Sequence, residues 1–424
     1  MSKRRLLEWG KTLLILLLSV TAVGLLAMTP LVQDSGLADL FSPRRGNGGA
    51  DQAEAVLSAF PPARVAVMSG SGRRGIQYDR ERVEELFFGF SSLLGDGLAS
   101  AGEAETVSAA LWEQYLSRVG IYFDFDRDVP LDALCAWLQP EGECDLAVFA
   151  RRVLLARGED DRVLLCYEDG EDGQFYACAT GLSASLHLDP AVASAGGDEA
   201  YFAYENEKLS ALLQPYTLIT EQETGLVWTA SAPLNGEDRT EEAVRALGFS
   251  GENRVAVAGG TAYPEGTARL EVSESGTFTY SDGHEGKFPV ASAGTEATVT
   301  EMIRAARALA DRTLGERCGE AELCLDAVYE TETGWVIRFG YRIGGSEVWL
   351  YEEGWAARFL IREGCIREFT LHFRTYSPTE EQVLLLPMDR AAVILPGLTA
   401  ERRELTLRYT DHGGDVLKPG WVAR

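Results

Sequence analysis

The strongest constraint on this chain is a stretch of 22 residues without a charge, Thr12 to Gln33, close to the N-terminus. At about 1.5 Å per residue, a helix of this length extends roughly 33 Å, enough to cross the hydrocarbon layer of a bilayer. Basic residues cluster before the stretch, and the first charged residue after it is Asp34. Because basic residues stay on the cytoplasmic side of a membrane, we expect residues 1–11 to be cytoplasmic and the bulk of the chain to be extracytoplasmic.

A cleaved signal peptide is the alternative, since it also begins with basic residues and an apolar core. The stretch is longer than a usual signal core, and Ala27-Met28-Thr29 is a poor match to a cleavage site. We therefore interpret residues 12–33 as an uncleaved, single-pass transmembrane helix. Residues 34–62 have the composition of a flexible linker, because Gly46-Asn47-Gly48-Gly49 disfavours a helix and Pro61-Pro62 stiffens the end.

Beyond the linker, helical periodicities precede runs of short, hairpin-linked strands. This order is typical of α+β domains, in which helices pack on antiparallel sheets, and not of parallel βαβ winding. At about 150 residues each, two or three extracytoplasmic domains fit. We expect one at residues 63–235 and a second region at 236–424, divided into a small subdomain at 236–290 and a C-terminal domain at 291–424.

Individual elements are predicted from apolar spacing and from turn residues. Helices are expected after the cap Asp79, at 106–118, from Pro130, and at 241–247, 297–314 and 387–394. Strands are expected at 64–68, 121–125, 146–155, 162–167, 174–179, 268–272, 277–280, 323–330, 335–341, 348–351, 356–361 and 368–374, with a closing hairpin at 404–421. Val83, Leu86, Phe87, Phe90 and Leu94 share the apolar face of the helix after Asp79.

The composition excludes some classes of partner. The net charge of −26 argues against binding to nucleic acid and against adsorption to anionic lipid. With 46% hydrophobic residues the chain should bury a substantial core. Among the seven cysteines, the pairs Cys135/Cys144 and Cys318/Cys324 are close enough in sequence for disulfides, but the odd number leaves at least one thiol unpaired. Scattered small core residues are the other interpretation.

Two short patterns resemble ligand-binding motifs. Gly70-x-Gly72-x-x-Gly75 follows a predicted strand as in a dinucleotide fingerprint, but the helix begins only at Asp79, whose carboxylate repels phosphate, so a flexible loop is predicted. Asp124, Asp126 and Asp128 resemble the start of a calcium loop, although its later positions hold Val129 and Cys135. The simpler prediction is that these aspartates form a solvated face at a strand end.

No catalytic, cofactor or metal site is predicted. Ser185, His187 and Asp189 have the residue types of a hydrolase triad, but alternate residues of a strand stand nearly 7 Å apart, whereas a triad needs contacts of about 2.6–3.2 Å. His372 is placed on the polar side of its predicted strand. No Cys-x-x-Cys pair and no metal-ligand spacing of the histidines occur.

Several short motifs together resemble one family. They are Gly75-Ile76-Gln77-Tyr78-Asp79, Gly120 to Phe125 followed by Val129-Pro130-Leu131 and Trp137-Leu138, Pro215-Tyr216-Thr217, Leu247-Gly248-Phe249, Gly260 to Val272, Ser275 to Tyr280, and Tyr409 with Pro419-Gly420-Trp421. The chain resembles the YycH/YycI-type proteins of Gram-positive bacteria, single-pass membrane proteins that regulate the WalK-type sensor histidine kinase controlling cell-wall metabolism. Two features depart from the family: the closing motif there more often reads Pro-Ala-Trp, and the cysteines match no family pattern.

The resemblance implies an anchor helix, stacked α+β domains and no catalytic residues. It also implies a sensor histidine kinase as partner, together with a related accessory protein. Within the anchor, Gly24 and Ala27 would let another helix approach, and Ser19 and Thr21 could add interhelical hydrogen bonds. Two alternatives remain: an extracytoplasmic binding or assembly protein of the cell envelope without a kinase partner, and a wall-active hydrolase whose carboxylates leave no sequence signature.

Overall fold

A computed structural model describes residues 60–70, 72–222, 224–234, 236–283, 286–291, 296–351, 353–395 and 403–424. Residues 53–424 form one compact unit. The expected anchor at 12–33 lies outside the described residues, as do Ser19, Thr21, Gly24 and Ala27. Among the helices that are described, none is both long enough and apolar enough to span a bilayer.

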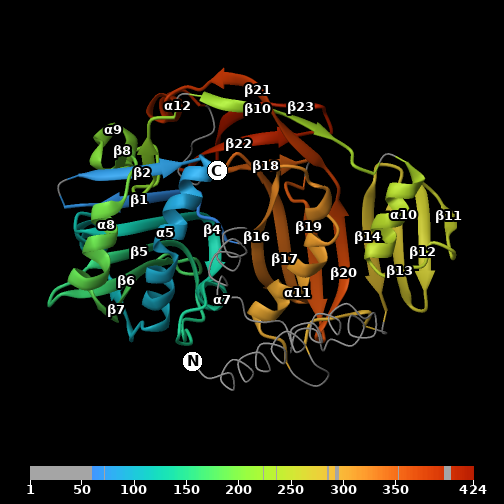
Figure 1. Ribbon diagram of the computed structural model, residues 1–424, viewed down its shortest axis with the longest axis horizontal. Coiled ribbons are helices and arrows are strands. Elements are labelled where there is room, and N and C mark those ends of the chain that lie inside the picture. The colour runs from blue at the N-terminus through green and yellow to red at the C-terminus, as the bar shows by residue number, and fades with distance from the viewer. Residues whose placement is uncertain are drawn as a thin grey trace, which may run out of the picture. The chain divides into compact units, whose positions relative to one another are not determined.

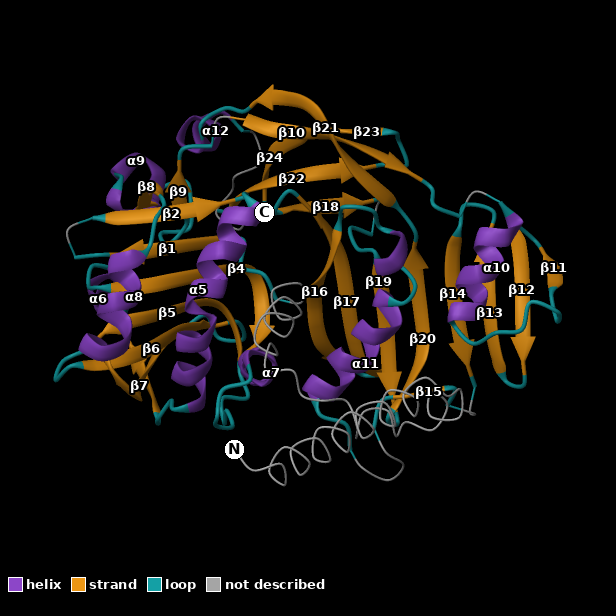
Figure 2. Cartoon of the chain, viewed as in Figure 1, coloured by secondary structure: helices purple, strands orange, loops and turns teal. Residues whose placement is uncertain are grey.

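The described residues form three sheets, shown in Figure 1 and Figure 2. The nine-stranded sheet has the order β3 (Ala104–Val107), β7 (Phe175–Ser183), β6 (Arg162–Asp169), β5 (Phe149–Arg157), β4 (Gly120–Pro130), β1 (Arg64–Met68), β2 (Arg73–Gln77), β8 (Asp198–Phe202), β9 (Leu218–Thr220). The three-stranded sheet has the order β21 (Thr375–Leu384), β10 (Thr224–Ser231), β23 (Val416–Leu417).

The twelve-stranded sheet contains the rest of the described strands. Its order is β11 (Val255–Val257), β12 (Gly260–Glu265), β13 (Ala268–Ser273), β14 (Thr277–Asp282), β20 (Cys365–His372), β19 (Ala357–Arg362), β17 (Gly334–Ile343), β18 (Ser346–Leu350), β22 (Leu405–Asp411), β24 (Pro419–Ala423). In addition, β15 (Phe288–Pro289) pairs with β20 and β16 (Glu322–Thr331) pairs with β17. Between named strands, the described pairings are antiparallel except for β18 with β22, so the predicted antiparallel α+β class is confirmed with one parallel exception.

The α-helices are α5 (Arg80–Ala99), α6 (Ala109–Leu116), α7 (Leu131–Leu138), α8 (Asp189–Ser194), α9 (Glu207–Ser210), α10 (Glu237–Ala246), α11 (Val299–Asp311) and α12 (Met388–Ile394). The longest of them, α5, begins where the sequence predicts, because the carboxylate of Asp79 accepts the Arg82 backbone N–H at 3.2 Å. Its apolar stripe is buried at Val83, Phe87 and Phe90, and the helix packs across β1, β6 and β7.

Helix α11 likewise begins at a capping residue and buries one face, here against the twelve-stranded sheet. Thr298 and Glu301 form a capping box, with Thr298 Oγ1 accepting the Glu301 N–H at 3.2 Å and Glu301 Oε2 accepting the Thr298 N–H at 2.8 Å. The buried face, which includes Ile303 and Ala306, packs on β17 and β19. Figure 2 shows this helix lying along the strands that it covers.

Several predicted boundaries are corrected by the structure. Residues 104–107 form strand β3, so the helix predicted at 106–118 begins only after its cap Ser108. Strand β21 was not predicted, because its sequence is polar and its residues are mostly exposed. Strand β10 pairs with β21 although more than 140 residues separate them, whereas the domain ranges 63–235 and 236–424 stay predictions.

The predicted loop of the glycine motif is shorter than expected, because Gly70 and Gly72 lie in the connection between β1 and β2 whereas Gly75 belongs to β2. Gly70 has φ +78° in the turn between β1 and β2, and Gly75 lies within β2. A Cβ on Gly75 would stand 2.9 Å from Leu218 Cδ2, closer than a real Cβ contact allows. The glycine is therefore needed for packing of β2 against β9.

Replacing Phe87 should test whether α5 organises the nine-stranded sheet. Phe87 is fully buried, with edge-on ring contacts to Phe123 at 5.7 Å and Phe125 at 6.4 Å. Phe87→Ala should lower the free energy of unfolding by about 3–5 kcal/mol in urea denaturation, because it leaves a cavity. The control is Phe88→Ala at the next position, where the ring is 47% exposed and the expected loss is below about 1 kcal/mol. Equal losses of unfolding free energy in the two variants would contradict the conclusion that Phe87 packs in the core between α5 and the sheet.

Candidate functional site

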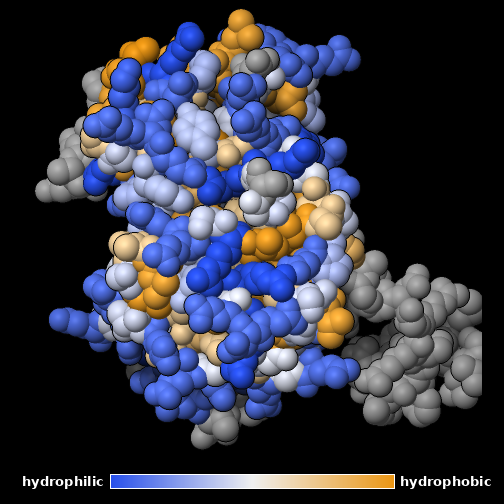
Figure 3. Space-filling model, turned by 90° about the vertical axis from the view of Figure 1, so that its left-hand side faces the viewer, coloured by the Kyte–Doolittle hydropathy of each residue, from blue (hydrophilic) through white to orange (hydrophobic). Residues whose placement is uncertain are grey.

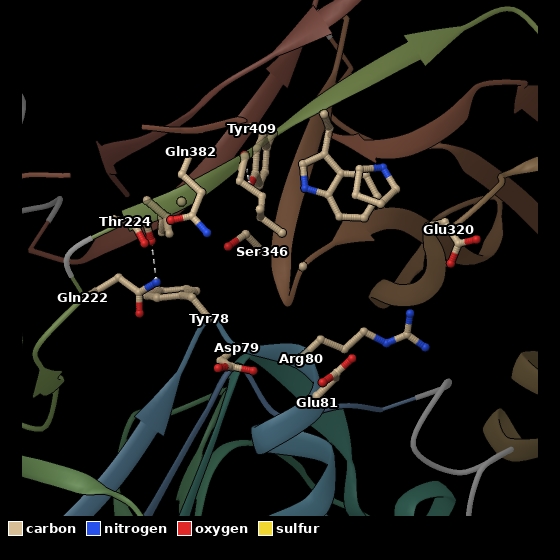
Figure 4. Close-up of a pocket in the computed structure, with 16 residues that line it drawn as sticks. Tyr78, Asp79, Arg80, Glu81, Gln222, Thr224, Glu320, Ser346, Gln382 and Tyr409 are labelled. Atoms are coloured by element: carbon tan, nitrogen blue, oxygen red, sulfur yellow. Dashed lines mark hydrogen bonds between the residues drawn. The ribbon is translucent and has the colours of Figure 1, made fainter. Parts of the chain in front are cut away.

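A cleft of about 500 Å³ lies where all three sheets contribute residues (Figure 4). The nine-stranded sheet and α5 provide Tyr78 to Glu81, and the three-stranded sheet provides residues of β10 and β21. The twelve-stranded sheet provides Ser346 at the start of β18 and residues of β22. We call this the junction cleft; its lining is Tyr78, Asp79, Arg80, Glu81, Gln222, Thr224, Gly225, Leu226, Trp228, Glu320, Gly344, Ser346, Pro378, Gln382, Leu407 and Tyr409.

Aromatic and hydrogen-bonding side chains share the lining of the junction cleft. Tyr409 is buried, and its hydroxyl donates to the Leu226 carbonyl at 2.8 Å, which fixes the ring beside β10. Gln222 Nε2 donates to the Thr224 carbonyl at 3.0 Å, the contact drawn in Figure 4. The volume lies in the range of small-molecule and peptide-binding pockets.

The carboxylates of the junction cleft outnumber its cations. Asp79, Glu81 and Glu320 form no ion pair with the part of the chain that is described. Arg80 is held by two other carboxylates, with Nε 2.9 Å from Glu84 Oε1 and Nη2 2.5 Å from Glu322 Oε1. The cleft therefore presents a net negative charge to an occupant.

Beneath the cleft, strand β4 carries a wide β-bulge. Asp124 is paired with Arg152 of β5, and the next paired residue of β4 is Val129, opposite Ala150. Within the bulge Asp126 adopts φ +62°. The bulge takes residues 125–128 out of the regular ladder, and Arg127 within it reaches the twelve-stranded sheet, where its Nη1 donates to the Leu325 carbonyl at 2.8 Å.

The aspartates of this bulge are buried, which corrects the predicted solvated face. Asp124 is 0% and Asp126 3% exposed, whereas Asp128 is exposed as predicted. Asp124 Oδ2 lies 2.7 Å from Arg64 Nη1, and Asp126 Oδ1 lies 3.2 Å from Arg151 Nη2. Arginines, not a metal, neutralise these carboxylates, and no cluster of metal-ligating side chains is found among the residues described.

The same arginines connect the bulge to the C-terminal strands. Arg64 Nη2 donates to the Leu405 carbonyl at 3.1 Å, and Arg152 Nη2 lies 2.7 Å from Glu404 Oε1. Arg151 also pairs with Glu404, and Arg424 Nη1 donates to the Asp126 carbonyl at 2.9 Å. We call Arg64, Asp124, Asp126, Arg151, Arg152, Glu404 and Arg424 the buried ionic network.

Burial alone would raise the pKa of Asp124, but the positive charges of Arg64, Arg151 and Arg152 outweigh the effect of burial and hold this pKa well below its usual range.

Tyr78 links the network to the junction cleft, because Arg64 donates to the Tyr78 hydroxyl while the ring lines the cleft. Burial raises the pKa of Tyr78 to about 12, against the opposing effect of Arg64, so the phenol stays protonated.

Glu322 is the second unusual carboxylate near the cleft. Burial and the neighbouring Glu84 together raise its pKa to about 7, against the opposing effect of Arg80. The side chain extends from β16 toward α5, so its charge state affects the contact between the twelve-stranded sheet and α5.

Ser185, His187 and Asp189, which have the residue types of a hydrolase triad, do not form a triad in the structure. Ser185 and His187 lie on a π-helical turn, Ala184–Leu188, and not on a strand as expected. Ser185 Oγ donates to Asp161 Oδ2 at 2.7 Å, and His187 Nδ1 lies 3.0 Å from the Ser183 carbonyl. Asp189 pairs with Arg157. Each side chain therefore has a separate local role.

His372 is buried against Tyr351 and Trp355, which corrects its predicted polar placement on the strand. Cys135 is buried and Cys144 is partly buried, whereas Cys318 Sγ donates to the Ala321 carbonyl at 2.9 Å. The seven cysteines are free thiols in the structure.

Sequence reasoning missed the junction cleft because its lining comes from segments that are far apart in the chain. The sequence features that could have indicated the cleft were the motif ending in Tyr78-Asp79 and the isolated Tyr409, which both line it.

The side of the molecule at the left in Figure 1 is mainly hydrophilic, with apolar residues in small separate groups (Figure 3). Such scattered apolar residues are ordinary for a protein surface.

Removing the charge of Asp124 should destabilise the protein strongly. Asp124→Asn leaves buried arginines without their carboxylate, and the free energy of unfolding at pH 7 should fall by about 3–5 kcal/mol. Asp128→Asn, an exposed position on the same strand, should change it by less than about 0.5 kcal/mol. Because the folded-state pKa of Asp124 lies below its unfolded value of about 3.9, the wild type should lose this stabilisation as pH falls below about 4, and the Asn variant should not. A similar acid loss in both would contradict the assignment.

Glu322 should make stability fall with rising pH. Its folded-state pKa lies above the unfolded value of about 4.3, so its contribution is complete below that pH and is lost as pH rises through about 7. Glu322→Gln, compared with wild type by denaturation, should therefore be relatively more stable at pH 8 than at pH 5. Glu330→Gln, exposed on the same strand, should differ from wild type equally at both pH values.

The chain is similar to known proteins in its fold, whereas its sequence matches none of those compared. No family model matches the chain, and no curated protein sequence matches it. An uncharacterized protein from Eubacterium rectale aligns with a TM-score of 0.28 at 15% identity, covering 48% of this chain and 78% of that one. The crystal structure of YycH from Bacillus subtilis aligns with a TM-score of 0.56 at 10% identity, covering 87% of this chain and 94% of that one. The chain therefore has a YycH-like fold, as the sequence resemblance implied.

Proposed function

We propose that this protein is a membrane-anchored extracytoplasmic regulator of a cell-wall-sensing histidine kinase, acting by protein contact and without catalysis. The observation that carries the proposal is the YycH-like fold, which extends over 87% of the chain. The resemblance of its short motifs to the YycH/YycI-type proteins points the same way.

The anchor and the ectodomain have separate parts in this proposal. The uncharged helix at 12–33 would hold the protein beside the transmembrane helices of the kinase, with Ser19, Thr21, Gly24 and Ala27 at the helix contact. Outside the membrane, the junction cleft provides an open surface with a defined charge. Ser185, His187 and Asp189 each have local partners, so these three residues give no support to a hydrolase triad.

The proposal predicts that a sensor kinase is captured with the full-length protein. Crosslinking in native membranes followed by pull-down should recover a histidine kinase that has its own transmembrane helices. A version in which residues 12–33 are replaced by an unrelated apolar helix should recover much less, because the helix contact is lost.

The control is the same replacement assayed for membrane insertion, so that mislocalisation is not mistaken for a lost contact. Undiminished capture by the replaced version would remove the anchor from the interface. Capture of wall-synthesis or secretion proteins, with no kinase, would overturn the regulator proposal in favour of an envelope assembly protein.

A further inference from the structure

The junction cleft contains a polar residue that the fold encloses almost completely and whose hydroxyl reaches the open space. Ser346 is 2% exposed and lines the cleft, and Figure 4 shows its hydroxyl directed into the open space. Within the described ranges, this hydroxyl makes no hydrogen bond to the protein. A polar group that enters the cleft can therefore form a hydrogen bond with this hydroxyl.

The charge of the cleft selects the class of occupant. Asp79, Glu81 and Glu320 carry carboxylates that no arginine or lysine of the described chain pairs with, while Arg80 is paired with Glu84 and Glu322. The rings of Trp228 and Tyr409 lie in the same lining. Carboxylates beside aromatic faces attract a guanidinium or an ammonium, and apolar walls accept its aliphatic stem.

The geometry of β21 favours an extended chain as the carrier of that cation. β21 is an outer strand, bonded to β10 on one side, and Pro378 and Gln382 of β21 line the cleft. Residues 318–320 cover only the start of its other edge, where Tyr376 N donates to the Cys318 carbonyl at 2.9 Å. Beyond Tyr376, no described strand pairs with this edge. An open edge presents N–H and C=O groups to which an extended segment can bond.

We propose that the junction cleft binds an extended segment of a partner protein that carries arginine or lysine side chains. The basic side chain lies against Trp228 and Tyr409 and reaches the carboxylates of Glu81 and Glu320. Polar groups of the segment bond to Ser346 and to the open edge of β21. The inference rests on the proposed function, because it names the chemistry by which the ectodomain recognises its partner.

Charge also argues against a second copy of this chain as the occupant. The protein carries a net charge of −26, and the open edge of β21 is flanked by the exposed Glu380 and Glu381. Two such surfaces repel one another, whereas a basic segment is attracted to both the edge and the cleft.

The test measures binding of three nine-residue peptides to the purified full-length protein by fluorescence anisotropy. The first alternates arginine with threonine and valine, the second replaces each arginine by citrulline, and the third by glutamate. Citrulline keeps the shape and removes the charge, so the arginine peptide should bind at least about tenfold more tightly than the other two. Its affinity should fall as salt is raised.

Substitutions in the cleft, compared with a control of equal charge change elsewhere, test whether the peptide binds in the junction cleft. The double substitution Glu81→Gln with Glu320→Gln should weaken binding of the arginine peptide about tenfold and leave the citrulline peptide unchanged. Ser346→Ala should weaken both. The control, Glu330→Gln with Glu332→Gln, makes the same charge change at an exposed hairpin and should alter neither.

Equal binding of the three peptides, no binding of any, or an arginine-peptide affinity unaffected by the Glu81/Glu320 variant would overturn the proposal. A dimer in analytical ultracentrifugation that the same variant dissociates would also overturn the proposal, since the occupant would then be a second copy.

Pull-down from membranes separates the cleft proposal from the proposed regulator function. If the kinase is captured equally by wild type and by the Glu81/Glu320 variant, the regulator function stands and the cleft proposal fails. If the arginine peptide binds as expected and no kinase is captured, the cleft proposal stands and the kinase partner fails.

Discussion

The pairing of two buried aspartates with arginines is the interaction on which the rest of the structure depends. Asp124 and Asp126 lie in the β4 bulge of the nine-stranded sheet, while Glu404 and Arg424 flank the C-terminal strands β22 and β24. Burying each charge singly would be costly, so the network is favourable only when both sheets supply their members together. It therefore couples folding of the nine-stranded sheet to docking of the last strands of the chain.

The ionic network also reaches the junction cleft through Tyr78. Arg64 bonds to Asp124, to the Leu405 carbonyl and to the Tyr78 hydroxyl, so one guanidinium fixes β1, the start of β22 and a wall of the cleft. A surface built this way keeps its shape when empty, which reduces the ordering that binding requires. The ion pair between Arg80 and Glu322 joins α5 to β16, and because burial raises the pKa of Glu322 to about 7, the charge of this pair changes near neutral pH.

The sequence predicted those elements whose signals are local. Strand β1, the cap and stripe of α5, and the strands from β16 to β20 follow from apolar spacing and turn residues within about twenty residues. The burial of Asp124 could not be predicted in this way, because its partner Arg64 lies 60 residues away and the Arg152 partner Glu404 lies 252 residues away. Seen alone, Asp-x-Asp-x-Asp has the composition of a solvated strand end. Strand β21 was missed for a related reason: an outer strand with polar, exposed residues lacks the alternation that identifies a half-buried strand.

The short motifs that carry the family resemblance meet at one place in the fold. Tyr78, from the motif at 75–79, has an edge-on contact with Trp421 of the closing motif, with ring centroids 5.8 Å apart. Trp421 Nε1 donates to the Leu386 carbonyl at 2.8 Å, just after β21. A Cβ at Gly420 would meet no atom within 4 Å, so an alanine fits there and the departure from Pro-Ala-Trp leaves the joint intact. Since Tyr78, Asp79 and Tyr409 also line the junction cleft, the motifs on which the resemblance is based lie in this chain where the sheets join and where this surface is formed.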